Sequence, residues 1–104
     1  MKFIADVMLG KLARRLRLTG LDVLYEPGLQ DNEIIRLSLK QDRVILTRDR
    51  SLSQRPLAAR NVLICSEHVP DQLEQVLKTF KYLAGSRYLG AERIHKYSEI
   101  RILA

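Results

Sequence analysis

The sequence has a single cysteine, no tryptophan and no long apolar run. Its 104 residues include three prolines and five glycines, and Cys65 is the one cysteine. One cysteine can form neither an intrachain disulfide nor a cysteine-based zinc cluster, a pattern typical of cytosolic proteins. The apolar N-terminal stretch is interrupted at Asp6, far short of a signal-peptide core or a membrane span. We therefore expect a cytoplasmic protein without a membrane segment.

Acidic residues are outnumbered by basic ones. Lys and Arg total 18 against 12 Asp and Glu, which gives a formal net charge of +6. Such a charge on a small body favours a polyanionic partner, with nucleic acid as the first candidate, although many small basic proteins bind neither RNA nor DNA. The hydrophobic fraction of 46% and charged fraction of 29% are those of ordered globular proteins. We expect one domain over residues 1–104.

Apolar periodicity predicts strands that alternate with helices. The predicted strands cover residues 2–8, 21–25, 43–47 and 61–65. The predicted helices cover residues 9–19 and 31–41 and a segment that starts at Pro70, and residues 48–60 form a polar loop with room for one helical turn. This alternation implies right-handed crossovers and a mainly parallel sheet of four to five strands covered on both faces. The predicted fold class is therefore α/β.

The C-terminal part of the sequence is less regular than the rest. In the last predicted helix, the inward stripe consists of Leu73, Val76, Leu77 and Phe80. We divide the chain into a core of residues 1–83 and a variable tail of residues 84–104. Ile100 and Ile102 share one parity, which fits an edge strand over residues 98–103. Apolar residues of this tail would suit a homodimer contact or an inhibitor protein.

Three aspartates are expected at one edge of the sheet. Asp6 lies near the end of the first strand, Asp31 opens the helix after the second, and Asp49 follows the third strand by two residues. In an open parallel sheet, ligands bind beyond the carboxyl ends of the strands, so acids placed just after strands converge on the same rim. We interpret these three residues as a candidate catalytic and metal-binding group.

Clustered carboxylates repel one another unless a cation or protons neutralise them. Mg²⁺ and Mn²⁺ prefer oxygen ligands and keep several waters, one of which can attack a phosphodiester while the metal steadies the phosphate. Glu33 is a candidate fourth ligand, and a solvated acid in the first turn of a helix is an equally good interpretation. The acids thus indicate metal-dependent phosphodiester hydrolysis.

Each aspartate also has a purely structural interpretation. Asp31 fits a helix N-cap, Asp49 fits a turn that ends a strand, and Asp6 fits an ion pair with an arginine. Asp6 is the hardest to explain in this way, because a carboxylate in an otherwise apolar strand is costly to bury and needs a specific partner.

Basic residues near the predicted rim are candidates for binding RNA. Lys11, Arg14 and Arg15 fall on one face of the helix that begins just after Asp6. Arg48 and Arg50 flank Asp49, where they would either bind phosphate or neutralise the carboxylates. A solvated charged face is the alternative interpretation of the helical group. Gln72 lies at the start of the last helix, where it is either an exposed polar residue of the first turn or a residue of the site.

Several of these segments resemble one known family. The run from Phe3 to Leu18, followed by Gly20 to Tyr25, resembles the opening of the Mut-seven C-terminal (Mut7-C) RNase domains. Residues 31–35 are similar to their second acidic motif, residues 43–50 to their third, and residues 72–80 to their closing helix, so the likeness spans roughly residues 2–82. The resemblance implies a PIN-like three-layer fold, metal-dependent cleavage of RNA, and carboxylate ligands at Asp6, Asp31 and Asp49. It also favours Arg14, Arg48 and Gln72 as site residues.

The sequence departs from that family in one respect. Such domains often continue into a cysteine-rich zinc ribbon after a Ser-Arg-Cys segment, whereas this chain has Ser86-Arg87-Tyr88 and no later cysteine. Extra RNA contacts would then come from the tail, a dimer interface or another protein.

Three other functions fit parts of the pattern. The first is a nucleic-acid-binding module without catalysis, in which the acids are structural. The second is a PIN-type toxin restrained by a partner protein. The third is a phosphoacceptor domain, whose site needs a pair of acids after the first strand and a lysine after a late strand. It fits less well, because Asp6 has no second acid beside it and the fourth strand leads to Cys65-Ser66-Glu67. A metal-dependent ribonuclease that acts on single-stranded RNA is the function we favour.

Overall fold

The computed structural model describes residues 1–84 and 99–101 of the chain. The strands are β1 (Lys2–Ala5), β2 (Asp22–Leu24), β3 (Arg43–Thr47), β4 (Asn61–Leu63) and β5 (Glu99–Arg101). The helices are the 3-10 turn η1 (Val7–Leu9) and the α-helices α1 (Gly10–Leu18), α2 (Asp31–Gln41), α3 (Arg50–Ser53) and α4 (Val69–Ala84). The predicted alternation of strands and helices is confirmed.

The strands form one sheet in the order β2-β1-β3-β4-β5. The first four strands are parallel, and β5 pairs with β4 in the antiparallel direction. Parallel neighbours need a crossover connection, which the intervening helices provide. The fold is therefore a mixed α/β fold with a mainly parallel sheet, as the sequence predicts.

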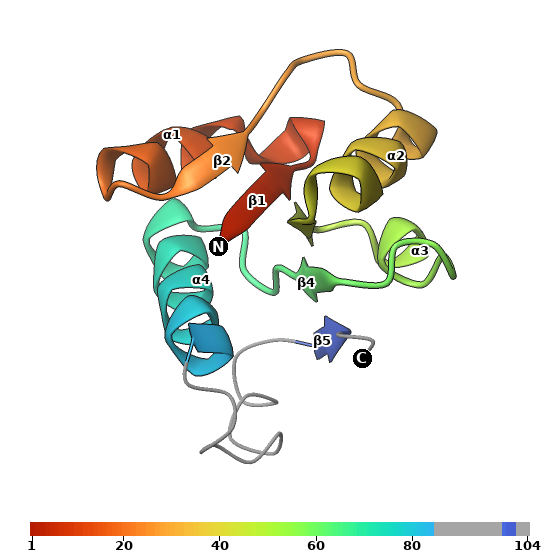
Figure 1. Ribbon diagram of the computed structural model, residues 1–104. Coiled ribbons are helices and arrows are strands. Elements are labelled where there is room, and N and C mark those ends of the chain that lie inside the picture. The colour runs from red at the N-terminus through yellow and green to blue at the C-terminus, as the bar shows by residue number, and fades with distance from the viewer. Residues whose placement is uncertain (85–98, 102–104) are drawn as a thin grey trace.

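Two helical layers cover the two faces of the sheet (Figure 1). In that view α1 and α4 lie on one side of the strands, and α2 and α3 lie on the other. Alternate residues of β1 serve the two layers, since Phe3 belongs to the core cluster of α1 and α4 while Ile4 belongs to the cluster of α2 and α3. Val44 and Ile45 divide in the same way on β3. Period-two alternation of wholly apolar side chains thus produces the three-layer, PIN-like arrangement.

Several predicted strand ends are wrong by a few residues. β1 stops at Ala5 rather than at Met8, because the chain turns at Asp6. The Asp6 amide donates to the Leu46 carbonyl at 2.9 Å, and the Asp6 carbonyl then accepts from the Leu9 amide, which closes the η1 turn. β2 is also shorter than predicted, and β4 ends at Leu63 rather than at Cys65. Asp6 therefore follows its strand instead of lying within it.

The helices require two corrections. Gln30 is the N-cap residue of α2, and Asp31 is its first helical residue rather than its cap. Leu77 does not belong to the inward stripe of α4, since its side chain is 36% exposed, whereas Val76 is fully buried. Gln75 and Thr79 occupy the inward face beside Val76. The α4 helix therefore presents polar as well as apolar groups to the sheet.

The predicted edge strand exists as β5. Most of the tail, including Ile102, lies outside the described residues, as does the predicted dimer or inhibitor contact. Within the described ranges, no helix combines the length and apolar character that crossing a membrane requires.

Candidate active site

The topology of the sheet creates one favoured place for a ligand. β1 lies between β2 and β3, so the chain leaves β1 toward one edge of the sheet and later returns to its other side. In open α/β sheets, ligands bind beyond the carboxyl ends of the strands at such a switch point. Asp6 follows β1 directly, and Asp49 lies two residues after the end of β3. Both acids therefore stand where this rule places a site.

A buried threonine connects these two aspartates. The Thr47 hydroxyl donates a 2.8 Å hydrogen bond to Oδ2 of Asp6, and the same hydroxyl oxygen accepts a 2.9 Å hydrogen bond from the Asp49 amide. Thr47 is 0% exposed and Asp6 is 6% exposed. Asp6 forms no ion pair with an arginine among the described residues, so the ion-pair interpretation of this acid is not what the structure shows.

Asp49 is the N-cap of the short helix α3. Its Oδ1 accepts hydrogen bonds from the Ser51 hydroxyl at 2.7 Å, the Ser51 amide at 2.9 Å and the Leu52 amide at 3.4 Å. The Ser51 hydroxyl, followed by the two amides, lowers the pKa of the Asp49 carboxyl below its usual value of 3.8 despite partial desolvation. Asp49 is thus a carboxylate at neutral pH with one oxygen engaged by the helix.

The other two predicted acids lie at the start of α2. Asp31 is half-buried in the first turn. The Glu33 carboxylate accepts a 3.1 Å hydrogen bond from the Gln30 amide, as in a capping box. Among the described residues, no group of three or more His, Cys, Asp or Glu side chains forms an arrangement that could hold a metal ion. The structure therefore joins Asp6 with Asp49 but does not bring Asp31 or Glu33 into a three-acid cluster with them.

The basic residues of α1 are exposed. Lys11 lies in the first turn, directly after the end of β1 and η1, and Arg14 and Arg15 follow one turn later. Arg17 has a structural use, because its Nε donates a 2.8 Å hydrogen bond to the Val23 carbonyl on β2. The predicted cationic face is thus present and accessible, and its contact with RNA stays a prediction.

Arg48 and Arg50 line a hollow beside Asp49. The hollow has a volume of about 280 Å³, and its other lining residues are Leu63, Ile64 and Cys65. Gln72 is buried nearby on α4, and its side-chain amide donates a 2.9 Å hydrogen bond to the Ser66 carbonyl. Gln72 is therefore not an exposed polar residue at the start of a helix, which was one of its two interpretations, but a buried one that contacts the loop after β4.

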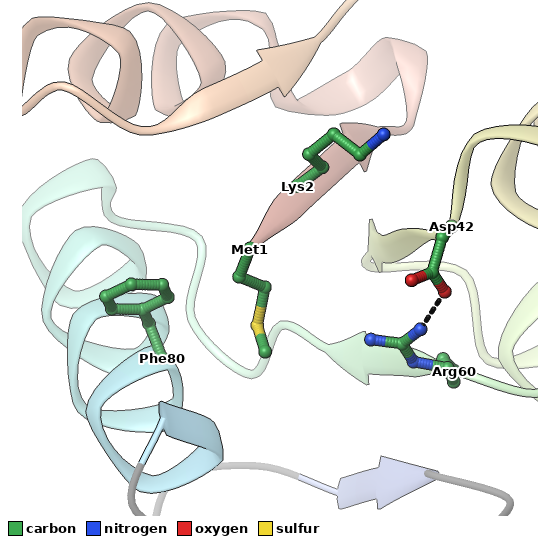
Figure 2. A pocket seen from close by; sticks show the side chains of 5 residues that line it. All are labelled: Met1, Lys2, Asp42, Arg60 and Phe80. Atoms are coloured by element: carbon green, nitrogen blue, oxygen red, sulfur yellow. Dashed lines mark hydrogen bonds and ion pairs between the residues drawn. The ribbon is translucent and has the colours of Figure 1, made fainter.

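A second hollow, of about 440 Å³, lies at the opposite edge of the sheet (Figure 2). Met1, Lys2 and Phe80 line it together with Asp42 and Arg60, which form an ion pair with each other. Apart from Phe80 on α4, these residues precede or begin β1, β3 and β4, whereas the candidate acids Asp6 and Asp49 follow β1 and β3. This hollow is therefore separate from the site at the switch point.

A comparison with known families agrees with the geometry. The family model described as Mut7-C RNAse domain matches residues 1–89, which include every acid of the candidate site. The chain belongs to the Mut7-C RNase domain family. No match to it is found among curated proteins or among solved structures. Membership places this Mut7-C domain among ribonuclease-type hydrolases, in agreement with the resemblance read from the sequence.

Two residues of this Mut7-C site were not singled out from the sequence. Thr47 was counted as the last residue of a strand and as part of the third family motif but was given no role of its own, although a hydroxyl at the end of an apolar strand and two residues before an acid is a usable signal. Gln75 is 4% exposed, and its side chain accepts from the Cys65 amide at 3.0 Å and donates to the Leu63 carbonyl at 2.9 Å. A glutamine on the inward face of an amphipathic helix is the corresponding signal for it.

Proposed function

We propose that this Mut7-C domain is a Mg²⁺- or Mn²⁺-dependent ribonuclease that hydrolyses phosphodiester bonds of single-stranded RNA. Asp6, Asp31 and Asp49 are the proposed catalytic and metal-binding residues, with Glu33 as an additional candidate ligand. Asp31 and Glu33 do not cluster with the other two acids in the structure, so on this proposal they would join them when the metal binds. The observation that carries the proposal is the hydrogen-bonded connection from Asp6 through Thr47 to Asp49 at the switch point of the sheet. It links the Asp6 carboxylate to the backbone of Asp49, so two acids from distant parts of the chain follow their strands at the same edge of the sheet.

The oxygen atoms available at this edge fit a hard divalent cation. The Asp6 carboxylate is nearly buried, and among the described residues its partner is the neutral hydroxyl of Thr47, bound to Oδ2. Asp49 engages Oδ1 with the helix. Each carboxylate thus keeps a second oxygen for a ligand, and a buried carboxylate without a cationic partner favours a cation beside it. When bound, Mg²⁺ or Mn²⁺ supplies an activated water and stabilises charge on the phosphate.

The chain itself would hold the substrate and fix the acids. Lys11 at the rim, followed by Arg14 and Arg15, offers cations to the phosphates that flank the reacting one. Thr47 keeps Asp6 in one position by a buried hydrogen bond, and the capping bonds of α3 do the same for Asp49. Fixed ligand oxygens favour catalysis because less reorganisation is needed during the reaction.

One experiment tests the proposal. Wild type, Asp6→Asn and Asp49→Asn are incubated with mixed single-stranded RNA and Mn²⁺, and the product ends are mapped. We expect cleavage by the wild type, loss of cleavage in EDTA, its return on adding Mn²⁺, and a fall of at least about 10²-fold in both variants, since metal ligands contribute that much or more. Asp22→Asn is the matched control, because Asp22 is an exposed acid on β2 whose partner is Arg43.

The rival function predicts a different result. A nucleic-acid-binding module would bind RNA equally well in EDTA and in the Asp6→Asn variant, and would leave the RNA intact. Wild-type protein that binds but does not cut RNA under any divalent-metal condition would overturn the proposed ribonuclease function.

A further inference from the structure

The hollow between the ends of β3 and β4 adjoins the candidate active site. Thr47 pairs with Leu63 in the parallel register, so β3 and β4 end together at the edge that carries Asp49. Arg48 lies between Thr47 and Asp49, and the hollow that it lines extends toward Cys65. The hollow, which we name the β3–β4 hollow, is therefore lined by the two sequence neighbours of Asp49.

The β3–β4 hollow combines a cationic side with an apolar wall. Arg48 and Arg50 provide the cations, and the wall consists of the exposed Cys65 and the small exposed parts of Leu63 and Ile64, which are 6% and 3% exposed. The Nη1 atom of Arg48 is buried and has no hydrogen-bond acceptor within the described part of the chain. A buried guanidinium nitrogen without an acceptor is unfavourable, so a phosphate oxygen would satisfy this donor if the Arg48 side chain turned it toward a ligand in the hollow.

The wall of the hollow is fixed in advance by α4. Gln75 binds the Leu63 carbonyl and the Cys65 amide with its two side-chain polar atoms, as a neighbouring strand would. The Leu63 carbonyl and the Cys65 amide, two backbone groups of the wall, are therefore both hydrogen-bonded to α4. A preformed wall binds a ligand at a lower cost in ordering than a loop that must first fold.

The size and chemistry of the hollow match one nucleotide unit. Its volume of about 280 Å³ lies near the lower end of the range of small-ligand pockets. An arginine suits a phosphate through its forked donors, and an apolar wall suits the sugar or the face of an unpaired base. A base in a duplex is stacked and paired and cannot turn toward such a wall, which restricts the ligand to single strands.

We propose that the β3–β4 hollow is a nucleotide subsite, in which Arg48 binds a phosphate next to the scissile one and Leu63, Ile64 and Cys65 contact the attached nucleoside. This subsite rests on the proposed ribonuclease function and extends it, because it sets the direction in which the RNA leaves the acids. Gln75 is a positioning residue that holds the wall.

The test uses the cysteine as a reporter. Cys65 is the one cysteine of the chain and its side chain is exposed, so alkylation by iodoacetamide reports on a single position. The rate of alkylation is measured in EDTA with and without a saturating single-stranded RNA decamer, with saturation established by fluorescence anisotropy. We expect RNA to slow the alkylation at least severalfold, whereas a blunt RNA duplex of the same length leaves the rate nearly unchanged.

Two variants locate the effect in the β3–β4 hollow. Arg48→Gln should weaken decamer binding about tenfold, the loss expected for one charged hydrogen bond to phosphate. Arg36→Gln is the matched control, since Arg36 is an exposed arginine on α2 that does not line the hollow. Cys65→Phe fills the hollow without changing charge and should also weaken binding. Thermal unfolding of each variant confirms that it is folded.

Failure of the subsite differs from failure of the proposed function. RNA that binds without slowing the alkylation of Cys65 overturns the subsite, as does equal binding by Arg48→Gln and Arg36→Gln. The ribonuclease function would still stand if metal-dependent cleavage persisted in that case. Protection of Cys65 by RNA that is never cleaved would support the subsite and would count against the enzyme.

Discussion

The Thr47 hydroxyl donates to the Asp6 carboxylate across 41 residues of sequence. This hydrogen bond joins the ends of the two adjacent strands β1 and β3, and it is buried. A carboxyl group at this depth requires a partner, and among the described residues that partner is the neutral hydroxyl of Thr47 rather than a cationic side chain.

Replacing Thr47 tests the importance of this hydrogen bond. Thr47→Val keeps the shape of the side chain but leaves both the Asp6 carboxylate and the Asp49 amide without their partner. We expect the free energy of unfolding to fall by about 1–3 kcal/mol, the cost of unsatisfied buried groups, with a larger relative loss of RNA cleavage. Urea unfolding and cleavage rates measure the two effects. Thr47→Ser retains the hydroxyl and should recover most of both, and a Thr47→Val protein as active as the wild type would contradict the prediction.

Two substitutions at Asp49 separate its structural and chemical roles. Asparagine caps helices about as well as aspartate does, so Asp49→Asn should change the unfolding free energy by less than about 0.5 kcal/mol, whereas Asp49→Ala should lower it by about 1 kcal/mol. Both variants should lose RNA cleavage, because neither supplies a carboxylate. Thermal unfolding beside a cleavage assay gives the comparison. Full activity in the Asp49→Asn variant would reduce Asp49 to a helix cap.

Gly10 and Tyr25 should show coupled effects on stability. A Cβ atom at Gly10 would lie 2.9 Å from the Tyr25 hydroxyl oxygen, which is held by a 2.8 Å hydrogen bond to the Val7 carbonyl. In the wild type, Gly10→Ala should therefore bring none of the gain of about 1 kcal/mol that alanine usually gives within a helix. In a Tyr25→Phe background the same change should be less unfavourable, because the contact with the hydroxyl oxygen is gone and only that with the ring carbon Cζ, at 3.1 Å, remains tight.

A double-mutant cycle by urea unfolding measures this coupling between Gly10 and Tyr25. Equal effects of Gly10→Ala in the two backgrounds would show that the side chains do not interact. The result also bears on the site, because Tyr25 anchors the η1 turn that directly follows Asp6.

The ion pair between Asp22 and Arg43 predicts a specific dependence of stability on pH. The hydrogen bond that the Arg43 guanidinium donates to the Asp22 carboxylate lowers the pKa of Asp22 below the usual value of 3.8. A carboxyl whose pKa is lower in the folded state stabilises the fold at pH values above its unfolded pKa, and this contribution is lost as the pH falls through the folded pKa. The melting temperature of the wild type should therefore exceed that of Asp22→Asn at pH 6, and the difference should shrink below about pH 4.

Added salt provides a control for the Asp22 prediction. Asp22 is exposed on β2, so 1 M NaCl should reduce the difference in melting temperature at pH 6. A difference that stays constant from pH 6 to pH 3 would show that the ion pair does not contribute.

Local patterns were sufficient for the order of the elements but not for their ends. The run Val44-Ile45-Leu46 could only be a buried strand between polar segments, and β3 has the predicted bounds. β1 was predicted too long, because Val7 and Met8 are as apolar as Phe3 and Ile4. The hydrogen bonds that end β1 come from β3 and from the η1 turn, which the local sequence does not encode.

For the candidate site, too, local sequence patterns identified some residues, and others became visible only in the folded chain. Placement after strands was enough to select Asp6 and Asp49, and the structure connects them. Asp31 was selected by the same rule, but the length of the loop after β2 and the capping of α2 at Gln30 decide where that helix begins. Thr47 and Gln75 act through partners far away in the sequence, so their roles become visible only in the folded chain.

By itself, the sequence determined the α/β class, the two-sided burial of the sheet and the family, since each of these depends on residues close together along the chain. Only the tertiary structure decided that Thr47 links Asp6 to the backbone of Asp49. That outcome depends on the strand order, which sets β1 beside β3, and on the residue at which each strand stops, and both result from the packing of the whole sheet between its two helical layers.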